Sequence, residues 1–114
     1  MEVTLELPFP PSVNTYWRSF KGRVLLSENG RKYKVSVFEA VLLAGRKRFA
    51  GNIKVEIAAN QPDNRRRDLD NYLKAPLDAL MAAGMYEDDS QIVDLRIYWT
   101  EEKGKTIKIT LRDA

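Results

Sequence analysis

The chain has no cysteine and no histidine among its 114 residues. The absence of cysteine excludes disulfides, thiol nucleophiles and iron–sulfur or zinc–thiolate sites, and it is typical of proteins from a reducing cytoplasm. The absence of histidine excludes serine–histidine triads, imidazole general bases and imidazole metal ligands. Any chemistry must therefore depend on carboxylates, lysine, arginine, tyrosine or a metal ion bound through oxygen, such as Mg²⁺, Mn²⁺ or Ca²⁺.

Long apolar runs are also absent. No stretch approaches the roughly 18 apolar residues that cross a membrane. The N-terminal MEVTLELPFP has an early acid and an alternating pattern, which are not features of a signal peptide. With 44% hydrophobic residues, the length predicts one domain over residues 1–114 with its own core, a cytoplasmic location and no membrane partner.

Charge is divided unequally along the chain. Residues 1–67 carry 13 Lys and Arg against 6 Asp and Glu, whereas residues 68–114 carry 6 against 10. This asymmetry favours a polyanionic partner that is bound by one part and acted on by the other. An ordinary solvated surface with uneven charge is the alternative.

Alternating apolar residues predict half-buried strands. These strands cover residues 2–7, 53–59, 92–100 and 107–111, with a shorter one at 24–26. The segment EEKGK is predicted to be a hairpin turn that makes 107–111 the antiparallel partner of 92–100. Residues 16–23, which are basic and aromatic, are predicted to form a loop.

Helical spacing predicts two helices. The first begins at Ser27, whose side chain can cap it, and stops at Gly45. The second covers about 70–83, where Pro76 predicts a kink or an irregular first turn. The fold class is therefore α+β: a mixed sheet of four to five strands with two main helices packed against it in a single domain.

The stretch RRRDLDNYLK, residues 65–74, concentrates the chemistry. At a strand-to-helix junction Asp68 and Asp70 can converge on one point, while Asp88 and Asp89 lie beyond the helix. Carboxylates around one point repel each other unless a cation neutralises them, and a hard divalent ion would lower the pKa of a bound water and clamp a phosphate. Lys74 would stabilise charge on the phosphorus or the leaving oxygen, and on a helix it shares a face with Asp70.

Arginines 65–67 would hold neighbouring phosphates. The alternative interpretations stay open at this point: Asp68 or Asp70 caps the helix, the arginines are paired surface charge, and Asp88 and Asp89 are turn residues. An EF-hand loop is disfavoured because Leu73 and Ala79 occupy its glycine and glutamate positions. A glycosidase carboxylate pair fits the residue types, but the arginines argue against a neutral sugar.

Three blocks in order resemble the RusA family of Holliday-junction resolvases. They are LPFPPSVNTYWR near the N-terminus, RRRDLDNYLKAPLDAL in the centre and AGMYEDDSQIVD after it. Together they extend over most of the chain, and the combination of D-x-D-N-x-x-K with a later D-D-x-Q is specific.

The resemblance implies a small homodimeric, Mg²⁺-dependent endonuclease, with Mn²⁺ as a substitute ion. Such enzymes bind four-way junction DNA and nick two strands symmetrically during DNA recombination and repair, and a bacterial or phage origin is expected. The resemblance places the family's metal-binding aspartates on Asp68, Asp70 and Asp89, its essential lysine on Lys74 and a DNA-contacting position on Arg67. Asn14 and Arg18 match the N-terminal motif, with a DNA-binding or structural role, and the residue types add Arg65 and Arg66 to the expected DNA contacts. A non-catalytic structure-selective DNA-binding module, or a nuclease of other branched DNA, is the alternative.

Overall fold

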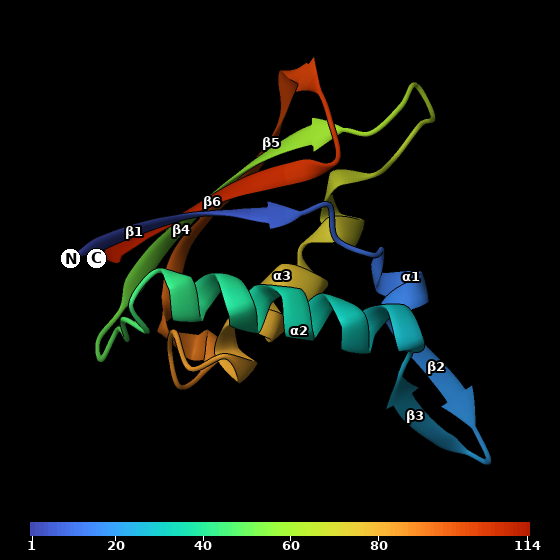
Figure 1. The fold of residues 1–114 in the computed structure, drawn as a ribbon, viewed down its shortest axis with the longest axis horizontal. Helices are drawn as coiled ribbons and strands as arrows, with labels where there is room; N and C mark the ends of the chain where they lie inside the picture. The colour runs from blue at the N-terminus through green and yellow to red at the C-terminus, as the bar shows by residue number, and fades with distance from the viewer.

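The alternating segments form a four-stranded mixed sheet in the computed structural model, which describes residues 1–114. Its order is β1-β6-β4-β5, in which β6 is antiparallel to both neighbours and β5 is parallel to β4 (Figure 1). The strands are β1 (Glu2–Pro8), β4 (Ile53–Gln61), β5 (Ile92–Lys103) and β6 (Thr106–Asp113). In β1, β4 and β6 every second side chain is buried, so one face of the sheet carries the core and the other faces solvent.

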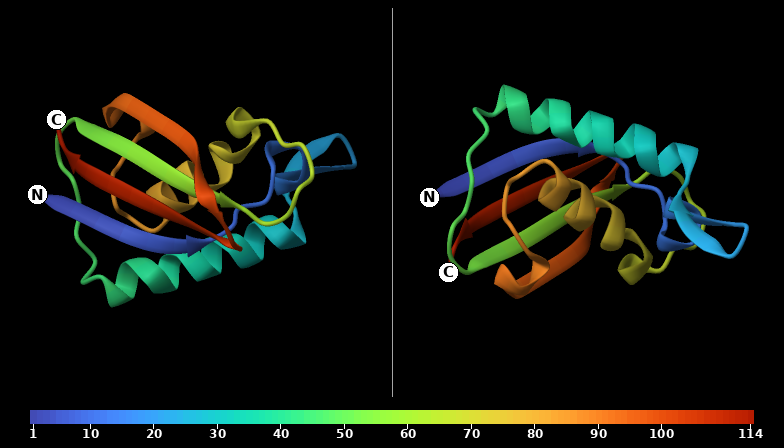
Figure 2. Two further views of the ribbon diagram at one scale, coloured as in Figure 1. Left: turned by 90° about the horizontal axis from the view of Figure 1, so that it is seen from above. Right: turned by 90° about the horizontal axis from the view of Figure 1, so that it is seen from below.

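Two helices cover the apolar face of the sheet (Figure 2). The first, α2 (Glu28–Leu43), begins at Ser27, whose side chain accepts a hydrogen bond from the Gly30 N–H at 3.0 Å. It ends before Gly45, which has a φ of 93°. These bounds confirm the prediction from the sequence, and the helix packs along β1.

The second predicted helix is divided into two pieces. A 3₁₀ turn, η1 (Leu69–Tyr72), precedes α3 (Lys74–Ala82). Pro76 is the third residue of α3, where a backbone N–H has no partner inside the helix, so its missing donor is tolerated. The irregular start expected from Pro76 is thus confirmed, while the continuous helix from residue 70 is wrong.

The N-terminal region contains a short helix and a strand that the sequence prediction missed, beside the short strand at 24–26 that it predicted correctly. After α1 (Val13–Tyr16), β2 (Trp17–Phe20) and β3 (Arg23–Leu26) pair as a separate hairpin that projects from the body (Figure 1). Lys21 and Gly22 both have positive φ, at 50° and 74°. Two such residues in succession form the turn that best matches the twist of a two-stranded ribbon. The predicted loop over 16–23 is therefore wrong.

The predicted hairpin between 92–100 and 107–111 is also wrong. Strand β4 lies between β5 and β6, and the connecting segment arches over the end of β4, where the Gly104 N–H donates to the Gln61 carbonyl. The crossover through α3 delivers β5 parallel to β4 on its outer side. The inner side of β4 remains open for β6, which fills the space beside β1.

One hydrophobic core joins all these elements, and no polar or charged residue is buried in it. Every ionisable candidate for function therefore lies at the surface or in a partly covered position. No helix has the length and apolar character needed to cross a membrane.

Candidate active site

The three arginines after β4 are organised by Asp63, a residue that the sequence analysis did not single out. Its Oδ1 accepts hydrogen bonds from the Arg65 N–H at 2.9 Å and from Arg67 Nη1 at 2.8 Å. Its Oδ2 accepts from Arg65 Nε at 3.1 Å and from Arg67 Nη2 at 3.2 Å. These bonds, with those from Arg67 the largest influence, hold the pKa of the Asp63 carboxyl well below its usual range.

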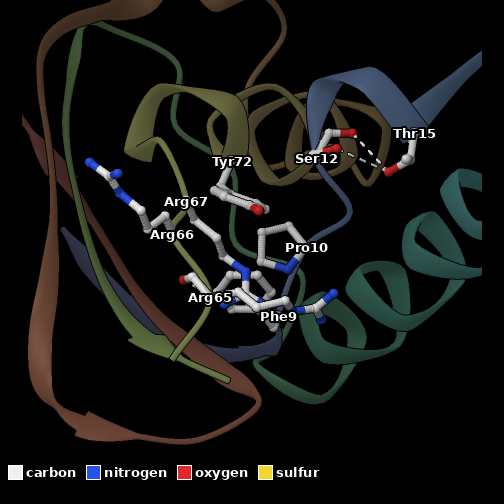
Figure 3. A pocket seen from close by; sticks show the side chains of 8 residues that line it. All are labelled: Phe9, Pro10, Ser12, Thr15, Arg65, Arg66, Arg67 and Tyr72. Atoms are coloured by element: carbon white, nitrogen blue, oxygen red, sulfur yellow. Dashed lines mark hydrogen bonds between the residues drawn. The ribbon is translucent and has the colours of Figure 1, made fainter. Parts of the chain in front are cut away.

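The three arginine side chains differ in exposure and in ion pairing. Arg67 lies over the Phe9 ring, 5.8 Å from its centroid, and only 10% of its side chain is exposed. Arg65 keeps 79% of its side chain exposed although it pairs with Asp63, and Arg66 forms no ion pair and extends away from the other two (Figure 3). The interpretation as paired surface charge thus fits Arg67 best, and Arg65 and Arg66 can reach a phosphate.

An open hollow of about 330 Å³ lies between this arginine segment and the proline-rich segment after β1 (Figure 3). Two aromatic side chains at the hollow are in contact, since the ring centroids of Phe9 and Tyr72 are 5.0 Å apart. The side chains that line it are cationic, hydroxyl-bearing or aromatic: Phe9, Pro10, Ser12, Thr15, Arg65, Arg66, Arg67 and Tyr72. Guanidinium and hydroxyl donors beside aromatic faces form a surface that suits a nucleic-acid backbone and its bases.

The two N-terminal candidates do not line this hollow. Asn14 is exposed on α1, next to Thr15, which is a lining residue. Arg18 is on β2 and lies over the Phe20 ring, 5.4 Å from its centroid. The hydroxyls of Ser12 and Thr15, which the sequence analysis missed, reach the hollow because α1 turns the chain there.

The carboxylates of Asp68 and Asp70 have no hydrogen-bonded role in the fold. Asp68 occupies the capping position of η1 but its side chain makes no capping bond. Asp70 lies in the 3₁₀ turn and Lys74 begins α3, and no ion pair joins them. Leu73, between the two segments, keeps right-handed helical dihedrals, and the shared face expected from the spacing of Asp70 and Lys74 stays a prediction.

The adjacent aspartates after α3 have contrasting environments. Asp88 caps the turn η2 (Asp89–Gln91) and accepts a hydrogen bond from the Ser90 N–H at 3.0 Å, and Ser90 lowers the pKa of Asp88. Asp89 Oδ1 is buried and has no hydrogen-bond partner. An orphan carboxylate oxygen is uncommon in a folded protein and calls for a ligand or a catalytic role. The turn role therefore applies to Asp88, and Asp89 remains free.

Gln91 fixes the position of η2, although sequence reasoning gave it no role. Its Oε1 accepts from the N–H groups of Glu87 and Asp88 at 2.8 and 3.1 Å. Its Nε2 donates to the carbonyls of Phe49 and Gly51 at 3.0 and 2.8 Å. The signal was present in D-D-x-Q, because an aspartate and a glutamine at this spacing form a capping box.

One chain does not bring the three candidate metal ligands together. Asp89 precedes β5, whose first residue, Ile92, is opposite Ile53 at the start of β4. The turn that carries Asp70 lies at the other end, where Tyr72 contacts Trp99 with 6.1 Å between ring centroids. Seven residue steps along β5, about 23 Å, separate Ile92 from Trp99. Asp89 is nearer to α3 than this span indicates, because it acts electrostatically on Tyr86, whose hydroxyl donates to the Leu77 carbonyl on α3.

No cluster of three or more carboxylates that could hold a metal ion is present in the chain. The structure therefore does not show Asp68, Asp70 and Asp89 gathered around one point, and their role as shared metal ligands stays a prediction.

Comparison with known proteins reveals close relatives. A family model described as Endodeoxyribonuclease RusA matches residues 8–112. A protein of Enterobacteria phage HK97, named crossover junction endodeoxyribonuclease RusA, is 41% identical over 97 residues, covering 84% of this chain and 81% of that protein. Proteins of the same name from Shigella sonnei and Escherichia coli K12 are each 39% identical over 115 residues, covering 96% of this chain and 93% of theirs. The family match includes the hollow, the arginine segment and all three candidate carboxylates.

Proposed function

Because the chain belongs to the Endodeoxyribonuclease RusA family, we propose that it resolves four-way DNA junctions by paired symmetric nicks. The observation that carries this proposal is the buried, unpartnered Asp89 oxygen on the same small domain as the arginine-lined hollow. The hollow supplies cationic and hydroxyl donors for phosphates, and the free carboxylates supply the chemistry. The process served would be DNA recombination and repair.

The carboxylates fit Mg²⁺, with Mn²⁺ as a substitute. Asp68 and Asp70 make no competing ion pair, and Asp89 has an oxygen without a partner, so all three are available as hard oxygen ligands. Such an ion supplies Lewis-acid stabilisation of the phosphate and lowers the pKa of an attacking water. No group of three carboxylates close enough to hold an ion is present in the single chain.

We propose that the active form is a homodimer. A four-way junction has two equivalent strands to cut, and a two-fold protein presents two equivalent sites. A dimer therefore matches the symmetry of the substrate.

The chain's own cations position the DNA. Arg65 is held by Asp63 with its guanidinium exposed, so it is oriented toward an incoming phosphate before binding. Arg66 is unpaired and reaches further along the backbone. Lys74, exposed at the start of α3 and without an ion pair, would stabilise negative charge on the leaving oxygen. Asn14 and Arg18 would contact flanking DNA from α1 and β2.

The relatives come from enterobacteria and their phages. We propose a bacterial or phage origin and action in the cytoplasm, where such DNA is found. Expression of a fluorescent fusion in a bacterial host would show whether the protein is distributed with the DNA or excluded from it.

The test is cleavage of labelled four-way, flap and linear duplex DNA in Mg²⁺, in Mn²⁺ and in chelator. We expect paired nicks at symmetric positions in the four-way junction alone. Asp70→Asn and Asp89→Asn should abolish cleavage while junction binding survives. Asp88→Asn is the matched control, because it makes the same change of charge one residue away and asparagine also caps a turn.

Other outcomes contradict the proposal in distinct ways. Equal cutting of flap DNA would indicate a nuclease of other branched DNA. Salt-sensitive binding without product under any divalent ion would indicate a non-catalytic DNA-binding module. Full cleavage by Asp70→Asn would refute the carboxylate site.

A further inference from the structure

Strand β5 is an uncovered edge of the sheet. It has no partner on its outer side, and all four residues from Val93 to Arg96 are exposed. Val93 and Leu95 are apolar and 55% and 41% exposed, and Leu95 is opposite Val55 on the core face of the sheet. A long edge with exposed apolar side chains and free backbone N–H and C=O groups is a template for pairing with another strand.

The opposite edge of the sheet is protected against such pairing. The apolar side chains of β1 are buried, since Val3 and Leu5 are only 7% and 6% exposed beside α2. The exposed positions include Glu2 and Glu6, and the strand ends in Pro8. Charged residues and proline are the usual devices that discourage pairing at an edge, and the central part of β5 has no proline and no protecting helix.

We propose that two copies of this chain pair through their β5 edges, antiparallel about a two-fold axis at Leu95. The inference rests on the homodimer proposed above and identifies its surface. The two sheets join as one continuous sheet of eight strands, with the helices of both copies on the same side.

The register follows from charge. In such a pairing, directly opposed residues point to the same face of the sheet. Residues on one face are an even number of positions apart, so the two-fold axis passes through a residue and not between two residues. An axis at Asp94 would set two aspartates opposite each other, and an axis at Arg96 would set two arginines opposite each other. An axis at Leu95 instead sets Asp94 opposite Arg96 of the partner subunit, and does so twice. Opposite charges stabilise directly opposed positions and like charges destabilise them.

The same register satisfies the apolar face. Leu95 meets its own copy on the axis, and Val93 lies opposite Ile97 of the partner subunit. Two residues that a single chain leaves about half exposed thus gain apolar neighbours. The regular pairing ends at Val93, because the register of β5 against β4 shifts between Ile92 and Asp94.

Cysteine cross-linking tests the surface and the register together. The chain has no cysteine, so Leu95→Cys introduces a single thiol that faces its own copy. Directly opposed strand residues have the Cα separation that a disulfide needs. Val93→Cys is the control, because four residue steps, about 13 Å along the strand, separate it from its copy. Val93 is also the more exposed of the two, so random collision would favour its cross-link.

We expect mild oxidation to convert most of the Leu95→Cys protein to a covalent dimer and little of Val93→Cys. Equal or greater cross-linking of Val93→Cys would overturn the register. A native chain that sediments as a dimer while Leu95→Cys stays uncrosslinked would overturn the surface. A chain that sediments as a monomer at concentrations that cut junctions would overturn the pairing and the homodimer, while the nuclease assignment would stand on the cleavage assay.

Charge exchange gives an independent readout of the pairing. Asp94→Arg and Arg96→Asp each place like charges opposite one another twice, and each should weaken dimerisation about tenfold or more. The double variant restores opposite charges and should recover most of the affinity, although Arg96→Asp also removes the contact with Glu56 at 3.3 Å within the chain. Dimerisation of the double variant as weak as that of either single variant would overturn the register.

Discussion

Replacing Gln91 with alanine tests how the structure holds η2 and the free aspartate on it. The side-chain amide of Gln91 accepts hydrogen bonds from the backbone N–H groups of Glu87 and Asp88. It donates hydrogen bonds to the backbone carbonyls of Phe49 and Gly51. Gln91 thereby ties the turn before β5 to the segment before β4. Alanine has no side-chain amide, so the variant loses all four hydrogen bonds.

The magnitude follows from those four bonds. Each contributes about 0.5–1.5 kcal/mol net, which gives about 2–6 kcal/mol for the set. Water replaces the amide at the exposed bonds, so we expect a loss of about 2–4 kcal/mol in the free energy of unfolding. In a domain of this size that lowers the melting temperature by about 8–16 °C. Below the melting temperature, cleavage should fall about tenfold to a hundredfold because Asp89 is no longer held in place.

The assay is thermal and urea unfolding followed by circular dichroism at one fixed protein concentration, combined with junction cleavage at low temperature. Gln61→Ala is the matched control, since Gln61 is the only other glutamine and its side chain makes no hydrogen bond. A melting temperature for Gln91→Ala within 2 °C or so of the Gln61→Ala value would refute the reasoning about these bonds. Wild-type cleavage by the folded variant would refute the link between Gln91 and Asp89.

Three further predictions concern single groups. Asp89→Asn should abolish cleavage and yet leave the melting temperature unchanged or raised, because the buried oxygen has no partner to lose; a clear drop in calorimetry would show a structural role instead. Tyr16→Phe removes the hydroxyl that donates to Asp78 at 2.6 Å and should cost about 1.5–3 kcal/mol in urea unfolding, whereas an unchanged midpoint would mean that the bond contributes nothing. Burial raises the pKa values of Tyr16, Tyr33 and Tyr86, and the hydrogen bond to Asp78 raises the pKa of Tyr16 further. The unfolded chain releases these protons above pH of about 10 while the folded chain retains them, so stability should fall as pH rises beyond that value; ionisation of all five tyrosines at that pH, seen by tyrosinate absorbance before unfolding, would contradict it.

Local pattern was sufficient for most elements. Alternation located β1, β4 and β6, and Ser27 and Gly45 bounded α2 correctly. Pro76 indicated the irregular start of α3, because its effect depends only on the missing N–H and the neighbouring turn. Lys21 and Gly22 were the overlooked turn signal, since two residues with positive φ are needed to close the small hairpin.

Pairing between distant segments could not be predicted in the same way. The burial pattern of β6 is the same whether its neighbour is β5 or β4, so sequence adjacency gave the wrong partner. The capping role of Asp88 and the free oxygen of Asp89 were likewise indistinguishable in the sequence, because both residues are aspartates in one polar turn.

The sequence by itself determined the α+β class and the family, because residue identity and local spacing are sufficient for these. Tertiary structure alone decided that Asp63 orients two of the arginines and that β4 separates β5 from β6. It also left β5 as an open edge. The physical reason is that strand order and register depend on which apolar faces bury one another across the whole chain, and no local pattern contains that information.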